Sequence, residues 1–299
     1  MQRSLLILLS DLAIVSVCWA ESYSLKIVRP EKVGDKAALS SKASDQMDLI
    51  ATNGGKIVDY KAIYQSGALD AVREVLTVND KGKPTKLKLT VKSLKYSANK
   101  DAEPKEILTD GKVVIATRSG KDASFTIDGK ELGDAAIKAL KLVVPLGPEN
   151  SLFDVESLFN TKTPRAVGDD WDAGVDEMIK SMGADMSVQF DPQTSGGKIQ
   201  LERIEKVNGI NCGILTGSVT LVPLSMRGLP EGTDFTDSAY KLTLTCPVPV
   251  DPEAPELGGK LVMTTSLKAD FPTSNGGKAR IHIIDAMSHE ESTKPIKRP

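Results

Sequence analysis

Alternation of polar and apolar residues is the feature that most constrains the fold of this chain. From Lys86 to Lys92 the sequence reads Lys-Leu-Lys-Leu-Thr-Val-Lys, which places the apolar side chains on one face of an extended strand. Leu94 and Tyr96 then follow in the opposite phase, so we expect a β-bulge near Ser93. The pattern predicts a strand of an antiparallel sheet that buries one face.

Similar strand patterns recur along the chain and are separated by turn sequences. Asn208-Gly209 is a strong hairpin signal, and Asp80-Lys81-Gly82-Lys83 predicts the loop of a hairpin that runs from Arg73 to Tyr96. Only two segments have convincing helical spacing. We therefore predict an α+β protein that is mainly β, with two related curved antiparallel sheets that each carry a short helix.

The two helical segments have apolar residues three and four positions apart. In the first, Asp134 is the candidate N-cap, and in the second the candidate is Asp172. The apolar positions are Leu132, Ala136, Ile137, Leu140 and Val144 in the first segment, and Val175, Met178, Ile179 and Met182 in the second.

A short motif occurs twice and suggests two related halves. The motif has the form Pro-x-x-Val-Gly-Asp and occurs at 30–35, where it ends in Gly34-Asp35, and at 164–169, where it begins with Pro164 and ends in Gly168-Asp169. The second copy is followed by Asp170-Trp171, and the first copy has no tryptophan after it. Gly-Asp predicts a turn, and Trp171 is expected to anchor apolar area beside it. The predicted organisation is a signal peptide at 1–20, a first β-rich half at 21–146, a connection at 147–160, a second half at 161–286 and a disordered tail at 287–299.

The first twenty residues have the composition of a targeting segment. Arg3 precedes an apolar run from Leu5 to Val17, and Cys18-Trp19-Ala20 gives the small-x-small end of a cleavage site. We predict export to the periplasm or the extracellular space and a soluble mature protein that is not integral to the membrane. An uncleaved anchor is the alternative.

Two cysteines follow the leader, Cys212 and Cys246. In an oxidising compartment they are candidates for one disulfide. The alternative is a pair of buried free thiols, because cysteine also packs as a small hydrophobic residue.

The sequence does not support catalysis or metal binding. A formal net charge of −2 gives no built-in attraction to nucleic acid. His282 lies on the polar side of its strand, and His289 falls in the predicted tail. The acidic run from Asp169 to Glu177 does not have the spacing of an EF-hand loop. We predict no catalytic residues, no metal and no cofactor, with enzymatic activity as a minor alternative.

The leader, Val167-Gly-Asp-Asp-Trp171, the helix after it and the hairpin from Val207 to Cys212 together resemble a family of exported bacterial β-rich proteins of unknown function. Such proteins are similar in outline to bacterial lipoprotein-carrier folds. The resemblance implies a curved antiparallel sheet that wraps a helix around an apolar cavity, and it assigns no catalytic residues.

These observations lead to two hypotheses of function. The first is a non-enzymatic exported protein that binds an apolar ligand, such as a lipid, or a protein of the cell envelope. Its candidate ligand-binding residues are Trp171, Met178, Ile179 and Met182. The second is a structural or interaction module of the envelope that has no ligand cavity and presents an exposed apolar patch or sheet edge.

Overall fold

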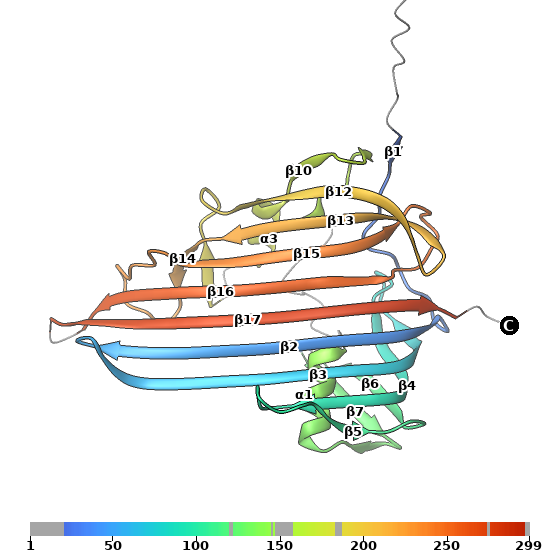
Figure 1. Ribbon diagram of the computed structural model, residues 1–299, viewed down its shortest axis with the longest axis horizontal. Helices are drawn as coiled ribbons and strands as arrows, with labels where there is room; N and C mark the ends of the chain where they lie inside the picture. Colours follow the sequence, from blue (N-terminus) through green and yellow to red (C-terminus); the bar gives the residue numbers. More distant parts are fainter. Residues whose placement is uncertain are drawn as a thin grey trace, which may run out of the picture.

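One antiparallel sheet of thirteen strands organises the part of the chain that the computed structural model describes (Figure 1). The described residues are 21–119, 122–144, 146, 158–182, 187–273 and 276–296. The predicted leader and most of the predicted connection at 147–160 lie outside them.

The order of the strands across the sheet differs from their order in the chain. From one edge to the other they are β10 (Asp170–Asp172), β12 (Gly196–Val207), β13 (Ile210–Leu221), β15 (Ala239–Pro249), β16 (Gly258–Pro272), β17 (Lys278–Pro295), β2 (Lys36–Asn53), β3 (Lys56–Val78), β4 (Pro84–Ser97), β6 (Val113–Ser119), β7 (Asp122–Ile127) and β8 (Lys130–Glu131), with β5 (Lys105–Leu108) paired to β4. Two short pairs lie apart from this sheet: β1 (Ser22–Tyr23) with β9 (Arg165–Ala166), and β11 (Val188–Phe190) with β14 (Pro223–Met226). The helices are α1 (Asp134–Val143) and α3 (Val175–Met182).

Local sequence explains the hairpins, and the mainly β class is confirmed. Asn208 and Gly209 have φ values of 52° and 85°, as a tight turn between β12 and β13 requires. Asp70 pairs with Ser93 while Ala71 pairs with Val91, so Lys92 is the extra residue of a bulge. This confirms the bulge expected near Ser93.

Both helices lie on the same face of the sheet. Residues directly opposite one another in antiparallel strands point to the same side. The register therefore connects one face from β13 to β3 through the opposed residues Val219, Leu242, Met263, Met287, Asp45 and Gln65. Val219 and Leu242 pack in the cluster that contains Met178 of α3, and Leu69, four residues beyond Gln65, packs in the cluster of α1. We call this the inner face, and Figure 1 shows both helices behind the sheet.

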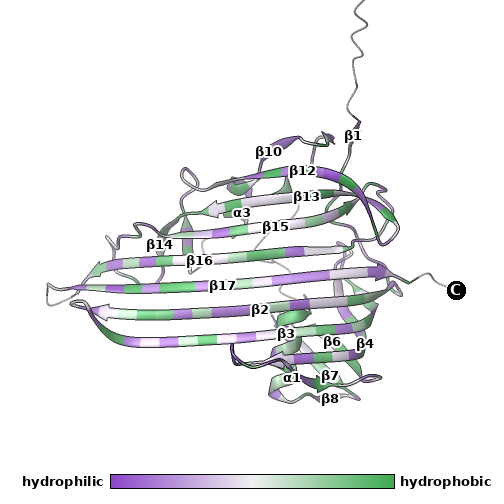
Figure 2. Cartoon of the chain, viewed as in Figure 1, coloured by the Kyte–Doolittle hydropathy of each residue, from purple (hydrophilic) through white to green (hydrophobic). Residues whose placement is uncertain are grey.

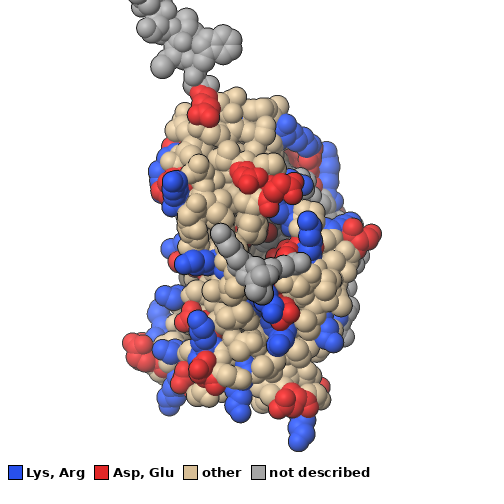
Figure 3. Space-filling view, turned by 90° about the vertical axis from the view of Figure 1, so that its right-hand side faces the viewer, with Lys and Arg blue, Asp and Glu red and all other residues tan. Residues whose placement is uncertain are grey.

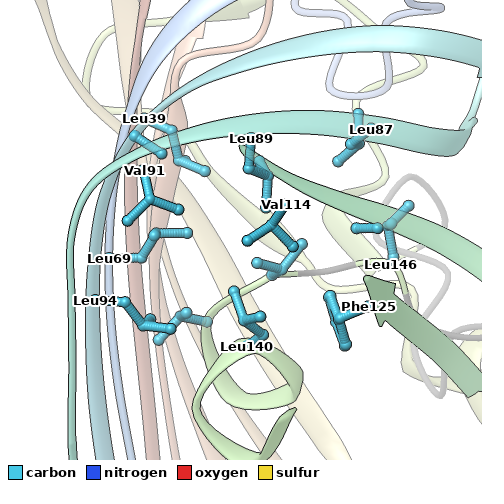
Figure 4. Close-up of a cluster of buried hydrophobic side chains, with 14 of the residues drawn as sticks. Leu39, Leu69, Leu87, Leu89, Val91, Leu94, Val114, Phe125, Leu140 and Leu146 are labelled. Carbon is cyan, nitrogen blue, oxygen red and sulfur yellow. The ribbon is translucent and has the colours of Figure 1, made fainter. Parts of the chain in front are cut away.

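The first core lies between α1 and the strands β2 to β7. Leu89 and Val114 come from the sheet, and Leu140 comes from the helix; all three are completely buried. Figure 4 shows these side chains converging from the sheet and the helix. Because each strand contributes every second residue, the alternation from Lys86 to Lys92 forms part of this core.

The second core lies at the opposite end of the sheet, where α3 and the N-terminal segment cover the inner face. Trp171 is 6% exposed and packs with Leu25, Ile199 and Leu201. The indole Nε1 donates a hydrogen bond of 2.7 Å to the carbonyl oxygen of Phe159. The ring of Trp171 is therefore buried among apolar side chains and its polar atom is hydrogen-bonded, as expected for a residue that anchors apolar area.

The two copies of the repeated motif form the same turn. Gly34 and Gly168 have positive φ values of 86° and 91°, which favour glycine. Asp35 accepts a hydrogen bond from the backbone N–H of Lys32 at 2.7 Å, and Asp169 accepts one from Ala166 at 2.8 Å.

Each turn then bonds to a strand in the same way. The N–H of Gly34 donates to the carbonyl oxygen of Val75, and the N–H of Val75 donates to the backbone carbonyl oxygen of Asp35. In the second copy, the N–H of Gly168 donates to the carbonyl oxygen of Leu201, and the N–H of Leu201 donates to the backbone carbonyl oxygen of Asp169. The predicted turn residues Gly34, Asp35, Gly168 and Asp169 thus have equivalent hydrogen bonds, and Pro164 directly precedes β9.

Two expectations about sheet number and the C-terminal segment were wrong. Thirteen of the strands belong to one continuous sheet, because β17 pairs with β2 and joins the two halves. The predicted disordered tail at 287–299 is strand as far as Pro295. Its polar sequence is held between β16 and β2, which pair with it on both sides.

The predicted helix caps also differ. Gly133, not Asp134, is the N-cap of α1, and it makes no side-chain cap. Asp172 ends β10, three residues before α3 begins, and forms an ion pair with Lys198 at 3.0 Å. Asp134 is therefore the first residue of α1, and Asp172 lies three residues before the first residue of α3. Helix ends are commonly uncertain by one or two residues.

The proposed disulfide between Cys212 and Cys246 is also wrong, since both cysteines are free. Cys212 lies opposite Pro249, and Cys246 lies opposite Leu215. Positions 246 and 249 are an odd number of residues apart, so the two thiols point to opposite faces of the sheet. A disulfide needs Cβ atoms that face each other about 4 Å apart, which this register prevents.

Replacement of Trp171 by Ala should lower the free energy of unfolding by about 3–5 kcal/mol, because it removes a buried aromatic ring. Urea denaturation followed by circular dichroism measures this change. Leu224→Ala is the control, since Leu224 is 60% exposed and its truncation should change stability little. A near-neutral effect of Trp171→Ala would contradict its anchoring role.

Candidate functional site

The inner face between the two cores carries apolar side chains that belong to neither core. We call these residues the inner strip: Met47, Leu49, Ile63, Ile283 and Met287. All five are half-buried, and none is among the members of the buried clusters around α1 or α3. Figure 2 shows hydrophobic stretches along the middle strands β16, β17 and β2.

The strip exists because the middle strands are longer than the cores that cover them. β3 has 23 residues and β2 and β17 have 18 each, whereas α1 has 10 and α3 has 8. A helix rises about 1.5 Å per residue and a strand about 3.3 Å, so these short helices cover only part of the strands. The remaining surface is an apolar face without a covering helix in the described part of the chain.

A small group of polar side chains lies beside the inner strip on the inner face. Thr265 of β16 lies directly opposite Asp285 of β17, and Asp45 of β2 is the diagonal neighbour of Asp285. Gln65 Nε2 donates a hydrogen bond of 2.8 Å to Asp45 Oδ2. Burial raises the pKa of Asp285 to about 6, and the charge of Asp45 and a hydrogen bond shared with it act in the same direction.

A second feature is a charged hollow of about 450 Å³ at the margin where the segment before β2 meets the end of β17. Its walls come from the N-terminal segment, the loop between β15 and β16, and the ends of β2, β3 and β17. Figure 3 looks onto this margin and shows acidic and basic residues side by side.

Two arginines tie the walls of the hollow together. Arg29 donates to the carbonyl oxygens of Asp251 at 2.6 Å and Pro249 at 2.7 Å, which fixes the N-terminal segment to the loop. Arg73 forms an ion pair with Glu31. Burial lowers the pKa of Arg73, but the hydrogen bond and charge of Glu31 outweigh burial and raise it above its ordinary value.

Glu256 is the most perturbed acid of this hollow. Its side chain is exposed and lines the hollow, where the surrounding protein atoms partly desolvate the carboxyl group. Burial raises its pKa from 4.5 to about 7, and the charges of Glu291 and Glu31 add to the rise. Arg73 and Arg29 act in the opposite direction. The hollow is therefore a structural junction whose charge depends on pH.

The residues predicted to bind a ligand occupy other places. Trp171 and Met178 are buried and fully packed by the protein's own side chains, and Ile179 packs at the edge of the same core as Met178. The side chain of Met182 lies outside the described residues. The structure thus does not bring these four together around an open cavity.

The histidines differ from expectation in their surroundings. His282 is half-buried, its Nε2 has no partner, and burial lowers its pKa together with the charges of Lys268 and Arg280. His289 lies in β17 and not in a tail, with its Nε2 3.8 Å from Glu291. Among the described residues, no group of three or more His, Cys, Asp and Glu side chains could hold a metal ion.

Comparisons with known proteins do not identify the chain. No family model matches it, and no curated protein matches it. A lipovitellin structure that concerns lipid–protein interactions aligns at 9% identity and a TM-score of 0.29, over 90% of this chain and 26% of that chain. DynF, from the dynemicin biosynthesis pathway of Micromonospora chersina, aligns at 8% identity and a TM-score of 0.20, over 92% of this chain and 96% of that one.

These scores are too low to assign a fold or a function. The present chain spans about a quarter of the lipovitellin chain that it matches. No helix within the described ranges has the length and apolar character needed to cross a membrane.

Glu256→Gln should stabilise the protein more at high pH than at low pH. Because its folded-state pKa lies above its unfolded value, the folded state binds the proton more tightly, and the wild type loses this contribution as pH rises from about 4.5 to about 7. The difference in Tm between Glu256→Gln and the wild type should therefore grow between about pH 5 and pH 8.

Glu253→Gln, at an exposed position of the same loop, is measured alongside as the matched removal of one carboxylate. Differential scanning fluorimetry across the pH range measures both variants. A constant difference for Glu256→Gln would contradict the raised pKa.

Proposed function

We propose that this is a non-enzymatic exported protein that binds an apolar ligand on the inner strip. The observation that carries the proposal is the set of half-buried Met, Leu and Ile side chains between the two cores. Methionine adapts its shape to irregular apolar partners, which suits a surface that accepts acyl or alkyl chains. The ligand class is a molecule with a hydrocarbon chain, such as a lipid.

Export rests on the leader at 1–20, and likeness to exported bacterial β-rich proteins rests on the motifs around Trp171. We further propose that the runs β2 to β8 and β10 to β17 are related halves. The equivalent turns at Gly34 and Gly168 support this relation, as does the six-strand order on each side of the β17–β2 pairing. α1 follows the last strand of the first run, whereas α3 follows the first strand of the second run. The proposed relation between the halves therefore covers their strands and turns but not their helices.

Replacement of Ile283 by Glu should weaken binding of a neutral apolar probe such as Nile red by at least about tenfold, because it places a charge in the apolar contact. Ile284→Glu is the matched control: it lies next along β17, points to the outer face and is 44% exposed. Fluorescence titration measures both affinities. Equal effects of the two variants, or no binding by the wild type, would overturn the proposal.

A second candidate function, an interaction module, has its own observation. Residues Lys56 to Gln65 of β3 pair with β2 on one side, while β4 begins to pair only at Ser66. Figure 1 shows β3 extending beyond β4. Ile57, Val58 and Tyr60 in this stretch are 68%, 65% and 59% exposed. Such an edge offers backbone hydrogen bonds and apolar area to another strand.

A second copy of the chain suits this edge through charge complementarity. A two-fold axis perpendicular to the sheet keeps the inner faces of both copies on one side, so it passes midway between the two copies of one residue. The unpaired stretch has its middle between Tyr60 and Lys61. An axis at Lys61 would oppose two lysines, whereas an axis at Tyr60 places Asp59 of each copy opposite Lys61 of the other. We infer the second register.

Lys61→Asp should then weaken dimerisation by about tenfold, because it replaces two opposite-charge pairs by two pairs of acids. The double variant Asp59→Lys, Lys61→Asp should restore it, since the charges are exchanged and remain complementary. Sedimentation equilibrium measures both. A monomer at all concentrations would contradict the dimer and would mean that the charges and the bulge at Val58 protect the edge.

A further inference from the structure

Two buried polar atoms beside the inner strip have no hydrogen-bond partner. Thr265 is 4% exposed and its Oγ1 has no partner, and Asp285 Oδ1 likewise has none. The two residues are opposite one another in the register of β16 and β17, on the inner face. A buried polar atom without a partner destabilises the protein, so each such atom needs an explanation.

A third acceptor lies beside them. Asp45 is the diagonal neighbour of Asp285 on the adjacent strand; its Oδ2 accepts a hydrogen bond of 2.8 Å from Gln65 Nε2, and its carboxyl group also shares a hydrogen bond with Asp285. Asp45 and Asp285 form no ion pair with a Lys or Arg side chain among the described residues. Three neighbouring strands therefore present oxygen acceptors, two of them carboxylates, within an apolar surface.

The chemistry of these acceptors selects the head group of a ligand. A primary ammonium carries one positive charge and three N–H donors. It can donate to Thr265 Oγ1 and to both carboxylates at once, and its charge balances the two acids. Neutral or anionic head groups would leave the acids repelling one another.

We propose that the inner strip binds a primary alkylammonium amphiphile, with the ammonium group held by Asp45, Thr265 and Asp285 and the alkyl chain on Met47, Ile63 and Ile283. This inference rests on the proposed function, because the alkyl chain uses the same apolar surface. It goes further in naming the charge of the head group and the three residues that bind it.

The test compares three ligands of equal chain length: decylammonium, decyltrimethylammonium and decanol. Affinities are measured with the full mature chain at about pH 7.5, by isothermal titration calorimetry below the micelle concentrations. The wild type should prefer decylammonium to decanol by about tenfold or more, as expected for a charge-assisted hydrogen-bonded head group.

Variants separate the contribution of the ligand's head group to affinity from that of its alkyl chain. Asp285→Asn should remove most of the preference for decylammonium over decanol, and circular dichroism reports whether the variant is folded. Glu290→Gln is the matched control, because it removes one negative charge from the outer face of the same strand. Thr265→Val should weaken decylammonium but not decyltrimethylammonium, which has no N–H to donate.

The outcomes distinguish the two proposals. Binding of none of the three ligands by the wild type would overturn both the proposed function and this inference. Binding of all three with similar affinity, or a preference for decylammonium that survives Asp285→Asn, would overturn the head-group assignment and leave the apolar site standing.

Discussion

Pairing between β17 and β2 is the constraint on which the rest of the structure depends. Seventeen consecutive residue pairs, from Ala279–Asn53 to Pro295–Ala37, join strands from opposite ends of the chain. Because register fixes which face each side chain occupies, this one ladder places α1 and α3 on the same side. Without it the chain would contain two separate sheets with no shared inner face.

The same pairing creates the inner strip. Each core stabilises its own end of the sheet, through Leu89 and Leu140 at one end and Trp171 and Met178 at the other. The long strands β16, β17, β2 and β3 span the distance between the cores. Within the described ranges no helix packs on their inner side chains there. The strip is therefore a consequence of joining two covered ends through long strands, and its apolar composition is what makes it a candidate binding surface.

Local patterns in the sequence were sufficient for the strands and turns. The alternation from Lys86 to Lys92, the Asn208-Gly209 turn and the repeated Gly-Asp turns each depend on neighbouring residues. The β17–β2 pairing could not be predicted, because it depends on residues far apart in the chain. Its polar C-terminal part resembles a tail until two neighbouring strands satisfy its backbone.

The candidate site could not be predicted for the same reason. Met178 and Ile179 have the apolar spacing of a helix that could line a cavity, yet the structure uses them as core. Asp45, Thr265 and Asp285 are distant in sequence, and nothing local distinguishes them from other polar residues of strands. Only the register of β16, β17 and β2 brings them together, so no single segment of the sequence reveals them.

The central claim is that an apolar ligand binds between the cores and not within them. NMR of the protein labelled with ¹³C-methyl methionine, during titration with decanol, tests this most directly. Met47 and Met287 lie on the inner strip, and Met178 is completely buried in a core. The account predicts that the methyl signals of Met47 and Met287 shift while that of Met178 stays in place. Unchanged signals for both strip methionines, or a shift confined to Met178, would contradict it.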